Sequence, residues 1–201
     1  MLHAGSAARL VGVCGGRYRE RGVVTVLVAY ASRHGATVGI AERIASGLRA
    51  AGLEAEARPV TDVRSVAGYD AFVIGSAAYM FHWLKDATVF AKRHHAELAE
   101  RPVWLFSSGP LGADLVDKEG HDVYQTSRPK EFGELQTLLH PRGERVFFGA
   151  WGADAPAIGF GERFLRLMPK AKSSLPVGDF RDWPAIDSWA LEIASAIKSG
   201  D

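Results

Sequence analysis

The polar segment 32–37 follows an apolar run, residues 24–31, and carries residue types suited to binding phosphate. Its residues are Ser32, Arg33, His34, Gly35, Ala36 and Thr37. The preceding run is rich in valine and too short to cross a bilayer, which favours a buried β-strand. Hydroxyl and imidazole donors beside a permissive glycine, where a helix begins, are typical of a phosphate site. The alternative is an ordinary strand-to-helix turn in which Ser32 and Thr37 only cap the helix.

A second segment, 76–83, combines small residues with three aromatic side chains and one histidine. It contains Ala77, Ala78, Tyr79, Met80, Phe81, His82 and Trp83. A large, flat, apolar ring would stack on an aromatic side chain, and Tyr79 is the preferred candidate. Phe81 and Trp83 could instead be core anchors at the start of a helix. His82 is a candidate proton donor, and the alternative is a solvated histidine without a role in catalysis.

A third segment, 107–112, is rich in serine and glycine. Ser108, Gly109 and Gly112 could offer backbone N–H groups to the polar edge of such a ring, because glycine permits close approach. Pro110 has no N–H and cannot donate.

Hydrophobic periodicity places these segments in an alternating order of strands and helices. We expect strands at 24–31, 53–58, 70–75, 103–107 and 145–150, and helices at 38–51, 84–100, 131–139 and after Asp182. Alternation of this kind predicts an α/β fold with a five-stranded parallel sheet in the order 2-1-3-4-5 and helices on both faces. The three polar segments would then meet at the carboxyl ends of neighbouring strands. Residues 113–130 form a long polar insert without periodicity, which is typical of a functional loop.

The segment 32–37 resembles the phosphate loop of flavodoxins, whose pattern is Thr/Ser-x-Thr/Ser-Gly-x-Thr, with His34 at the position of one hydroxyl residue. It has neither Gly-x-Gly-x-x-Gly nor a Walker Gly-Lys-Ser/Thr motif, which argues against dinucleotide and Walker-type sites. The resemblance implies a flavodoxin-like fold and FMN as cofactor. An imidazole can also donate to phosphate, but its charge would make binding depend on pH.

The chain further resembles the flavodoxin-domain group that includes the bacterial menaquinone-dependent protoporphyrinogen oxidases. This resemblance runs from about residue 25 to residue 197 and depends on segments 30–37, 69–76, 113–130, 148–150 and 182–183. It implies a quinone as electron acceptor, a porphyrinogen as substrate, and a role for the insert 113–130 in accommodating a bulky substrate.

Composition excludes several classes of protein. The 201 residues carry 24 basic and 23 acidic side chains, without a basic run of the kind that binds nucleic acid. The single cysteine, Cys14, excludes an internal disulfide and a multi-thiolate site, and no metal is expected. Residues 1–22 are expected to form a poorly ordered extension, or alternatively a mitochondrial-type targeting arm, before one domain at 23–201.

The segment 160–172 is basic and amphipathic, which is consistent with resting on an anionic membrane surface where quinones dissolve. The alternative is a helix packed on the edge of the sheet. We therefore expect a cytoplasmic, FMN-dependent oxidoreductase, with peripheral contact at the inner face of the cell membrane, that passes electrons from an organic donor to a quinone or another redox partner. Two alternatives remain: a soluble flavodoxin-type electron carrier, which would typically be strongly acidic, and a flavin-free flavodoxin-like interaction protein.

Overall fold

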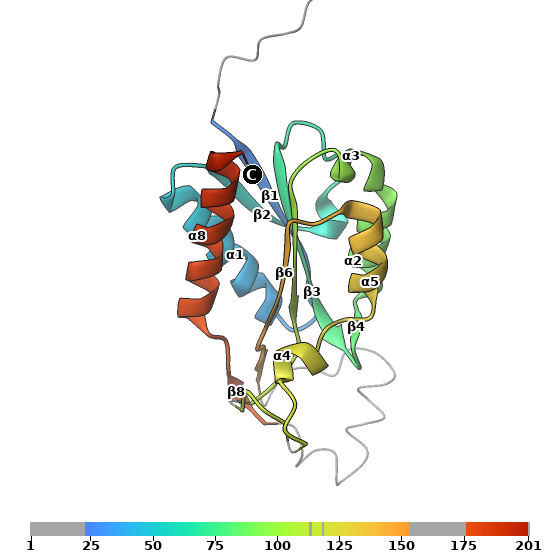
Figure 1. Ribbon diagram of the computed structural model, residues 1–201, viewed down its shortest axis with the longest axis vertical. Helices are drawn as coiled ribbons and strands as arrows, with labels where there is room; N and C mark the ends of the chain where they lie inside the picture. The colour runs from blue at the N-terminus through green and yellow to red at the C-terminus, as the bar shows by residue number, and fades with distance from the viewer. Residues whose placement is uncertain (1–22, 113, 118, 153–175, 201) are drawn as a thin grey trace, which may run out of the picture.

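A parallel β-sheet forms the centre of the molecule (Figure 1). The computed structural model describes residues 23–112, 114–117, 119–152 and 176–200. The parallel strands are β1 (Thr25–Ala31), β2 (Glu54–Pro59), β3 (Ala71–Tyr79), β5 (Val103–Ser108) and β6 (Gly143–Phe147). They lie side by side in the order β2-β1-β3-β5-β6. Numbered along the chain, this is the expected order 2-1-3-4-5, so the α/β, flavodoxin-like fold is confirmed.

The register of the sheet brings the carboxyl ends of β1 and β5 to the level of Ser76 and Ala77, near the end of β3. Ala31 at the end of β1 pairs with Ser76 of β3. Ala77 of β3 pairs with Ser108 at the end of β5. The polar segments that follow these strands therefore begin at one edge of the sheet, where ligands bind in open α/β folds.

Helices cover both faces of the sheet, as expected. On one face lie α1 (Ala36–Ala50) and α8 (Trp183–Ser199), and on the other α2 (Lys85–Arg93), α3 (His95–Ala99) and α5 (Glu131–Leu139) (Figure 1). The two faces carry separate apolar cores, because successive residues of a strand point to opposite sides. Val26 and Val28 of β1 join the core under α1 and α8, whereas Leu27 joins the core under α2 and α5.

The two helices on the first face pack closely. A Cβ atom added at Gly47 of α1 would lie 2.8 Å from the Cβ of Ala190 in α8, so this crossing requires a residue without a side chain. Asp182 caps α8 as predicted, because its Oδ1 accepts a hydrogen bond of 3.0 Å from the backbone N–H of Ala185.

Some element boundaries differ from the prediction. The expected helix 84–100 is interrupted at His94, whose ring is buried against Phe90 (5.0 Å between ring centroids) and whose φ of −105° departs from helical values. The strand predicted at 145–150 is instead β6 at Gly143–Phe147, and Ala150–Trp151 forms β7, which pairs with β8 (Gly178–Asp179). The short helices η1 (Val60–Asp62) and α4 (Val123–Thr126) were not predicted.

The strand predicted at 70–75 was too short. It continues to Tyr79, and its last residues pair with β4 (His82–Trp83) in a hairpin. Ser76 and Ala77 belong to the strand because they pair with Ser107 and Ser108 of β5. Ala78 and Tyr79 are therefore strand residues, whereas the prediction placed them in a loop.

The extension 1–22 and the amphipathic segment 160–172 lie outside the described residues. Among the described helices, none combines the length and the apolarity needed to cross a bilayer.

Candidate functional site

A pocket of about 270 Å³ lies at the carboxyl ends of β1, β3 and β5. This volume is close to the lower end of the roughly 300–1,000 Å³ that is typical of ligand sites. Ten residues selected from the sequence line it: Ser32, His34, Ala36, Thr37, Ala77, Ala78, Tyr79, Met80, Ser108 and Gly109. Residues from all three predicted segments, 32–37, 76–83 and 107–112, thus line one pocket.

Two buried hydroxyl groups belong to residues that line the pocket. The Oγ1 of Thr37 and the Oγ of Ser108 lie 2.8 Å apart and share a hydrogen bond. Thr37 is in the first turn of α1 and Ser108 is the last residue of β5. The bond therefore joins the start of the helix to the neighbouring strand end.

The loop before α1 is shaped by Gly35, the N-cap residue, which has a φ of 89°. A left-handed conformation of this kind strongly favours glycine. The N–H of Gly35 donates to Ser32 Oγ at 3.1 Å. Gly35 has no side chain with which to cap the helix, and the first turn contains no acidic residue. Within the first turn itself, no carboxylate offsets the positive end of the helix dipole, which suits a bound anion.

Aromatic rings also line the pocket. The ring of His34 lies 4.8 Å from that of Trp151 and 6.3 Å from that of Tyr79, both in edge-to-face geometry. The guanidinium of Arg33 lies 4.7 Å from the centroid of the Tyr79 ring. Residues 33 and 34 therefore connect the phosphate-type loop with the two large rings that line the pocket.

Four residues that line the pocket were not selected from the sequence: Leu111, Gly149, Ala150 and Trp151. The last three follow β6 at the same edge of the sheet. The rule that identified the first three segments, that ligands lie beyond the carboxyl ends of strands, applies equally to β6 and would have found them.

Four predicted residues do not line the pocket. Arg33 and Gly35 lie in the loop before α1. The left-handed backbone of Gly35 sets the turn, and the guanidinium of Arg33 lies over the Tyr79 ring. Gly112 has a φ of 113° and lies just beyond Leu111. His82 lies on β4, with its side chain 53% exposed and its Nδ1 2.8 Å from Oε1 of Glu131. Its role as a proton donor stays a prediction.

Glu131 holds the β3–β4 hairpin against the start of α5. Its carboxylate is the partner of His82 and also accepts a hydrogen bond of 3.0 Å from the backbone N–H of Trp83. Partial burial raises the pKa of the Glu131 carboxyl, but the hydrogen bonds from His82 and Trp83 outweigh it, and the pKa lies below its usual value.

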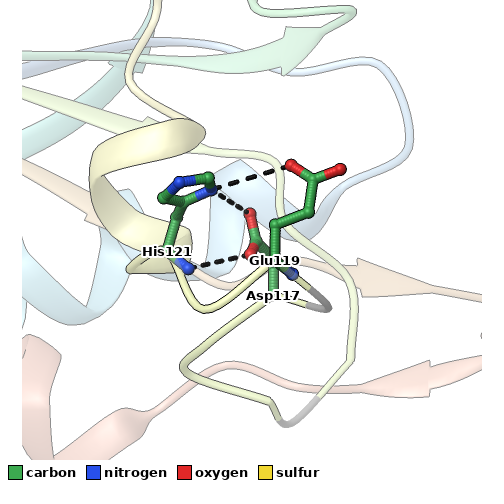
Figure 2. A group of neighbouring side chains, drawn as sticks. All are labelled: Asp117, Glu119 and His121. Carbon is green, nitrogen blue, oxygen red and sulfur yellow. Dashed lines mark hydrogen bonds and ion pairs between the residues drawn. The ribbon is translucent and has the colours of Figure 1, made fainter.

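The insert 113–130 contains a compact charged turn (Figure 2). Asp117, Glu119 and His121 place ligand-type atoms within 4.8 Å of one another, a grouping that the sequence analysis did not anticipate. Asp117 accepts hydrogen bonds of 2.9 Å from the backbone N–H groups of Glu119 and His121, and His121 Nδ1 lies 3.5 Å from Asp117 Oδ2. These contacts lower the pKa of Asp117, the backbone bond from His121 foremost, and they account for the shape of the turn.

A larger hollow of about 450 Å³ runs between β6, α4 and α8. Four of its charged side chains form two ion pairs, Arg128 with Glu144 at 2.6 Å and Arg145 with Glu192 at 3.1 Å, while Asp122 caps α4. It contains none of the residues that the sequence selected, so we place the chemistry in the smaller pocket.

Comparison with known proteins agrees with the fold. A family model described as a flavodoxin domain matches residues 27–165 of the 201-residue chain. No curated protein sequence matches the chain closely enough to count as a relative.

Solved structures similar to the chain share its fold at low sequence identity. A rubredoxin:oxygen oxidoreductase from Desulfovibrio gigas matches with a TM-score of 0.56 and 12% identity, over 87% of this chain and 36% of that one. A flavodoxin from the domain Archaea matches with a TM-score of 0.53 and 15% identity, over 87% and 99% of the two chains. A variant of the flavodoxin from Pseudomonas aeruginosa matches with a TM-score of 0.54 and 16% identity, again over 87% of this chain and 99% of that one. The chain thus spans about a third of the oxidoreductase and nearly the whole of these flavodoxins.

Proposed function

The chain belongs to the flavodoxin-domain family, and from this we propose that it is an FMN-dependent oxidoreductase that passes electrons from an organic donor to a quinone. FMN is the cofactor of flavodoxin domains, so the family supports the first part of the proposal. The observation that carries it further is the pocket itself, whose lining combines the hydroxyl groups of Thr37 and Ser108 with the aromatic rings of Tyr79 and Trp151.

The residues present fit the parts of FMN. Ser32, Thr37 and the backbone N–H groups at the start of α1 would hold the phosphate, because donors and the helix dipole both favour an anion there. Tyr79 or Trp151 would stack on the flavin ring. The backbone of Ser108 and Gly109 would approach the polar edge of the ring, since Gly109 has no side chain to obstruct it.

When bound, FMN would supply the redox chemistry, a two-electron, two-proton transfer from an organic donor, which is oxidised, to a quinone, which is reduced to the quinol. The residues of the pocket would position the ring. Apolar residues of the pocket, among them Ala78 and Leu111, favour a flat apolar reactant over water.

Net charge supports an enzyme over a shuttle. With 24 basic and 23 acidic residues, the chain lacks the strongly negative field with which a small carrier is steered onto basic partners. The porphyrinogen implied by the finer resemblance, to the menaquinone-dependent protoporphyrinogen oxidases, is the first donor to test. Contact of segment 160–172 with a membrane stays a prediction.

The first experiment is a titration of FMN with purified protein at micromolar concentration, followed by quenching of flavin fluorescence. We expect saturable binding at one site per chain. Colourless protein that gives no quenching would overturn the redox proposal and leave the flavin-free interaction protein as the function to pursue.

The second experiment separates a quinone-linked enzyme from a carrier. The flavin of the loaded protein is reduced chemically and its oxidation by menadione is followed by stopped flow. An enzyme with a quinone site should give a rate that saturates with menadione. A rate proportional to menadione throughout, and no faster than that of free reduced FMN, would contradict a quinone site.

A further inference from the structure

The turn between β3 and β4 has an unusual backbone for its residues. Tyr79 pairs with His82, so Met80 and Phe81 alone form the turn. Their φ angles are 51° and 64°. Two-residue turns with positive φ at both positions are normally built from Asn and Gly, because a side chain in the left-handed region crowds the backbone.

Both side chains are also exposed although both are apolar. Met80 is 83% exposed and Phe81 is 52% exposed. An Asn-Gly turn would remove the backbone strain and the apolar surface at once. Strain of this kind concentrates at functional sites. The stability of the fold does not explain why Met80 and Phe81 occupy this turn, which indicates a functional role.

The turn is held firmly by α5, beside which β4 lies in Figure 1. The carbonyl of Phe81 accepts a hydrogen bond of 3.0 Å from the backbone N–H of Lys130. Glu131 binds His82 and Trp83 on the other side of the turn. The Trp83 ring is buried against that of Phe132, with 5.2 Å between their centroids. The two exposed side chains are thus presented on a rigid support, which lowers the entropy lost on binding.

The turn also borders the pocket. Met80 lines it, and Tyr79 immediately before the turn is one of its aromatic rings. An apolar molecule that touches Met80 and Phe81 would therefore lie at the entrance of the proposed flavin site.

We propose that Met80 and Phe81 form the contact surface for the flat apolar ring of the quinone, and this rests on the proposed function. Two side chains match the size of one such ring, whereas a protein partner typically covers about 800 Å² of each surface. A thioether and a phenyl ring suit an aromatic ligand. Neither carries charge, and the adjacent His82 is already paired with Glu131.

The test compares Phe81→Gly with wild type. Glycine relieves the positive φ, so the variant should fold and melt at the same or a higher temperature. We expect the KM for menadione to rise about tenfold, in proportion to the apolar contact removed. Phe81 is not among the residues placed around FMN, so the titration of FMN on the same sample verifies that the flavin site is intact. Leu191→Ala, which shortens an exposed apolar side chain on α8, is the matched control and should leave the KM unchanged.

A second readout does not depend on turnover. Menadione quenches tryptophan fluorescence on contact, so its dissociation constant can be measured with and without FMN. Weaker binding in Phe81→Gly but not in Leu191→Ala would support the proposal. Equal menadione binding and equal KM in wild type and Phe81→Gly would overturn it, even if FMN binding and quinone reduction stand. Failure of FMN to bind would instead overturn the proposed function, and the quenching measurement would still decide whether the turn holds the ring.

Discussion

The hydroxyl groups of Thr37 and Ser108 share a buried hydrogen bond of 2.8 Å across 71 positions of the sequence. The bond fixes the first turn of α1 against the end of β5, so the two parts of the site that carry polar groups cannot shift independently.

Replacing Thr37 with valine tests this bond, because the two side chains have nearly the same shape. The buried hydroxyl of Ser108 would lose its partner, which typically costs about 1–3 kcal/mol of stability. FMN affinity should fall about tenfold if the Thr37 hydroxyl also donates to the phosphate. Urea unfolding and fluorescence titration measure the two effects. Thr137→Val on the exposed face of α5 is the control, and an unchanged dissociation constant for FMN in Thr37→Val would exclude Thr37 from the site.

Replacing His34 with threonine restores the hydroxyl of the flavodoxin phosphate loop. If the imidazole donates to phosphate in its charged form, wild-type affinity for FMN should be lower at about pH 8 than at about pH 6. The variant should show a flatter dependence and bind more tightly at the higher pH. Titrations at both pH values decide this, and identical pH profiles would mean that His34 only packs against Trp151.

Adding a methyl group at Gly47 tests the packing of α1 on α8. Alanine is favoured over glycine in a helix by about 1 kcal/mol, but the new Cβ would lie 2.8 Å from that of Ala190. Overpacking costs roughly 1–3 kcal/mol, so we expect a net loss of about 1 kcal/mol in unfolding free energy.

A second glycine provides the matched control for this substitution. A Cβ at Gly133, on the exposed side of α5, would meet nothing within 4 Å, so Gly133→Ala should stabilise by roughly 0.5–1 kcal/mol. The double variant Gly47→Ala/Ala190→Gly should recover part of the loss, and additive effects of the two substitutions would show that the helices can move apart freely.

The hydrogen bonds that the Glu131 carboxylate accepts from His82 and Trp83 stabilise the fold to an extent that depends on pH. Because the pKa of Glu131 is lower in the folded protein than its ordinary value, this contribution is present above the unfolded pKa and disappears as the pH falls through the folded pKa. The difference in unfolding free energy between wild type and Glu131→Gln should therefore be constant near neutral pH and shrink below about pH 4. Urea unfolding at a series of pH values measures it. Glu134→Gln removes an exposed carboxylate from the same helix and controls for the change in charge. A difference that grows as the pH falls would contradict the assigned hydrogen bonds.

Much of the fold could be predicted because buried strands and amphipathic helices leave clear periodicities. The end of β3 could not, since Ser76, Ala77 and Ala78 have no strand pattern and become strand only by pairing with β5 and β4. Ten residues that line the pocket were predicted because ligands bind beyond the carboxyl ends of parallel strands. Trp151 was missed because that expectation was not applied to β6. The left-handed turn at Met80 and Phe81 runs against local preference, and no pattern in the residues indicates it.

The packing of α8 on α1 also orders the events of folding. Arg43 of α1 and Asp187 at the start of α8 form a bidentate pair across 144 positions of the chain. During synthesis α1 emerges long before α8, so the part of its apolar face that packs on α8 has no cover until most of the domain has been made. Contacts between such distant segments form slowly. Until α8 has been made, this uncovered apolar surface favours aggregation and recognition by chaperones. Substitutions in α8 should therefore reduce the yield of folded protein more than they reduce its final stability.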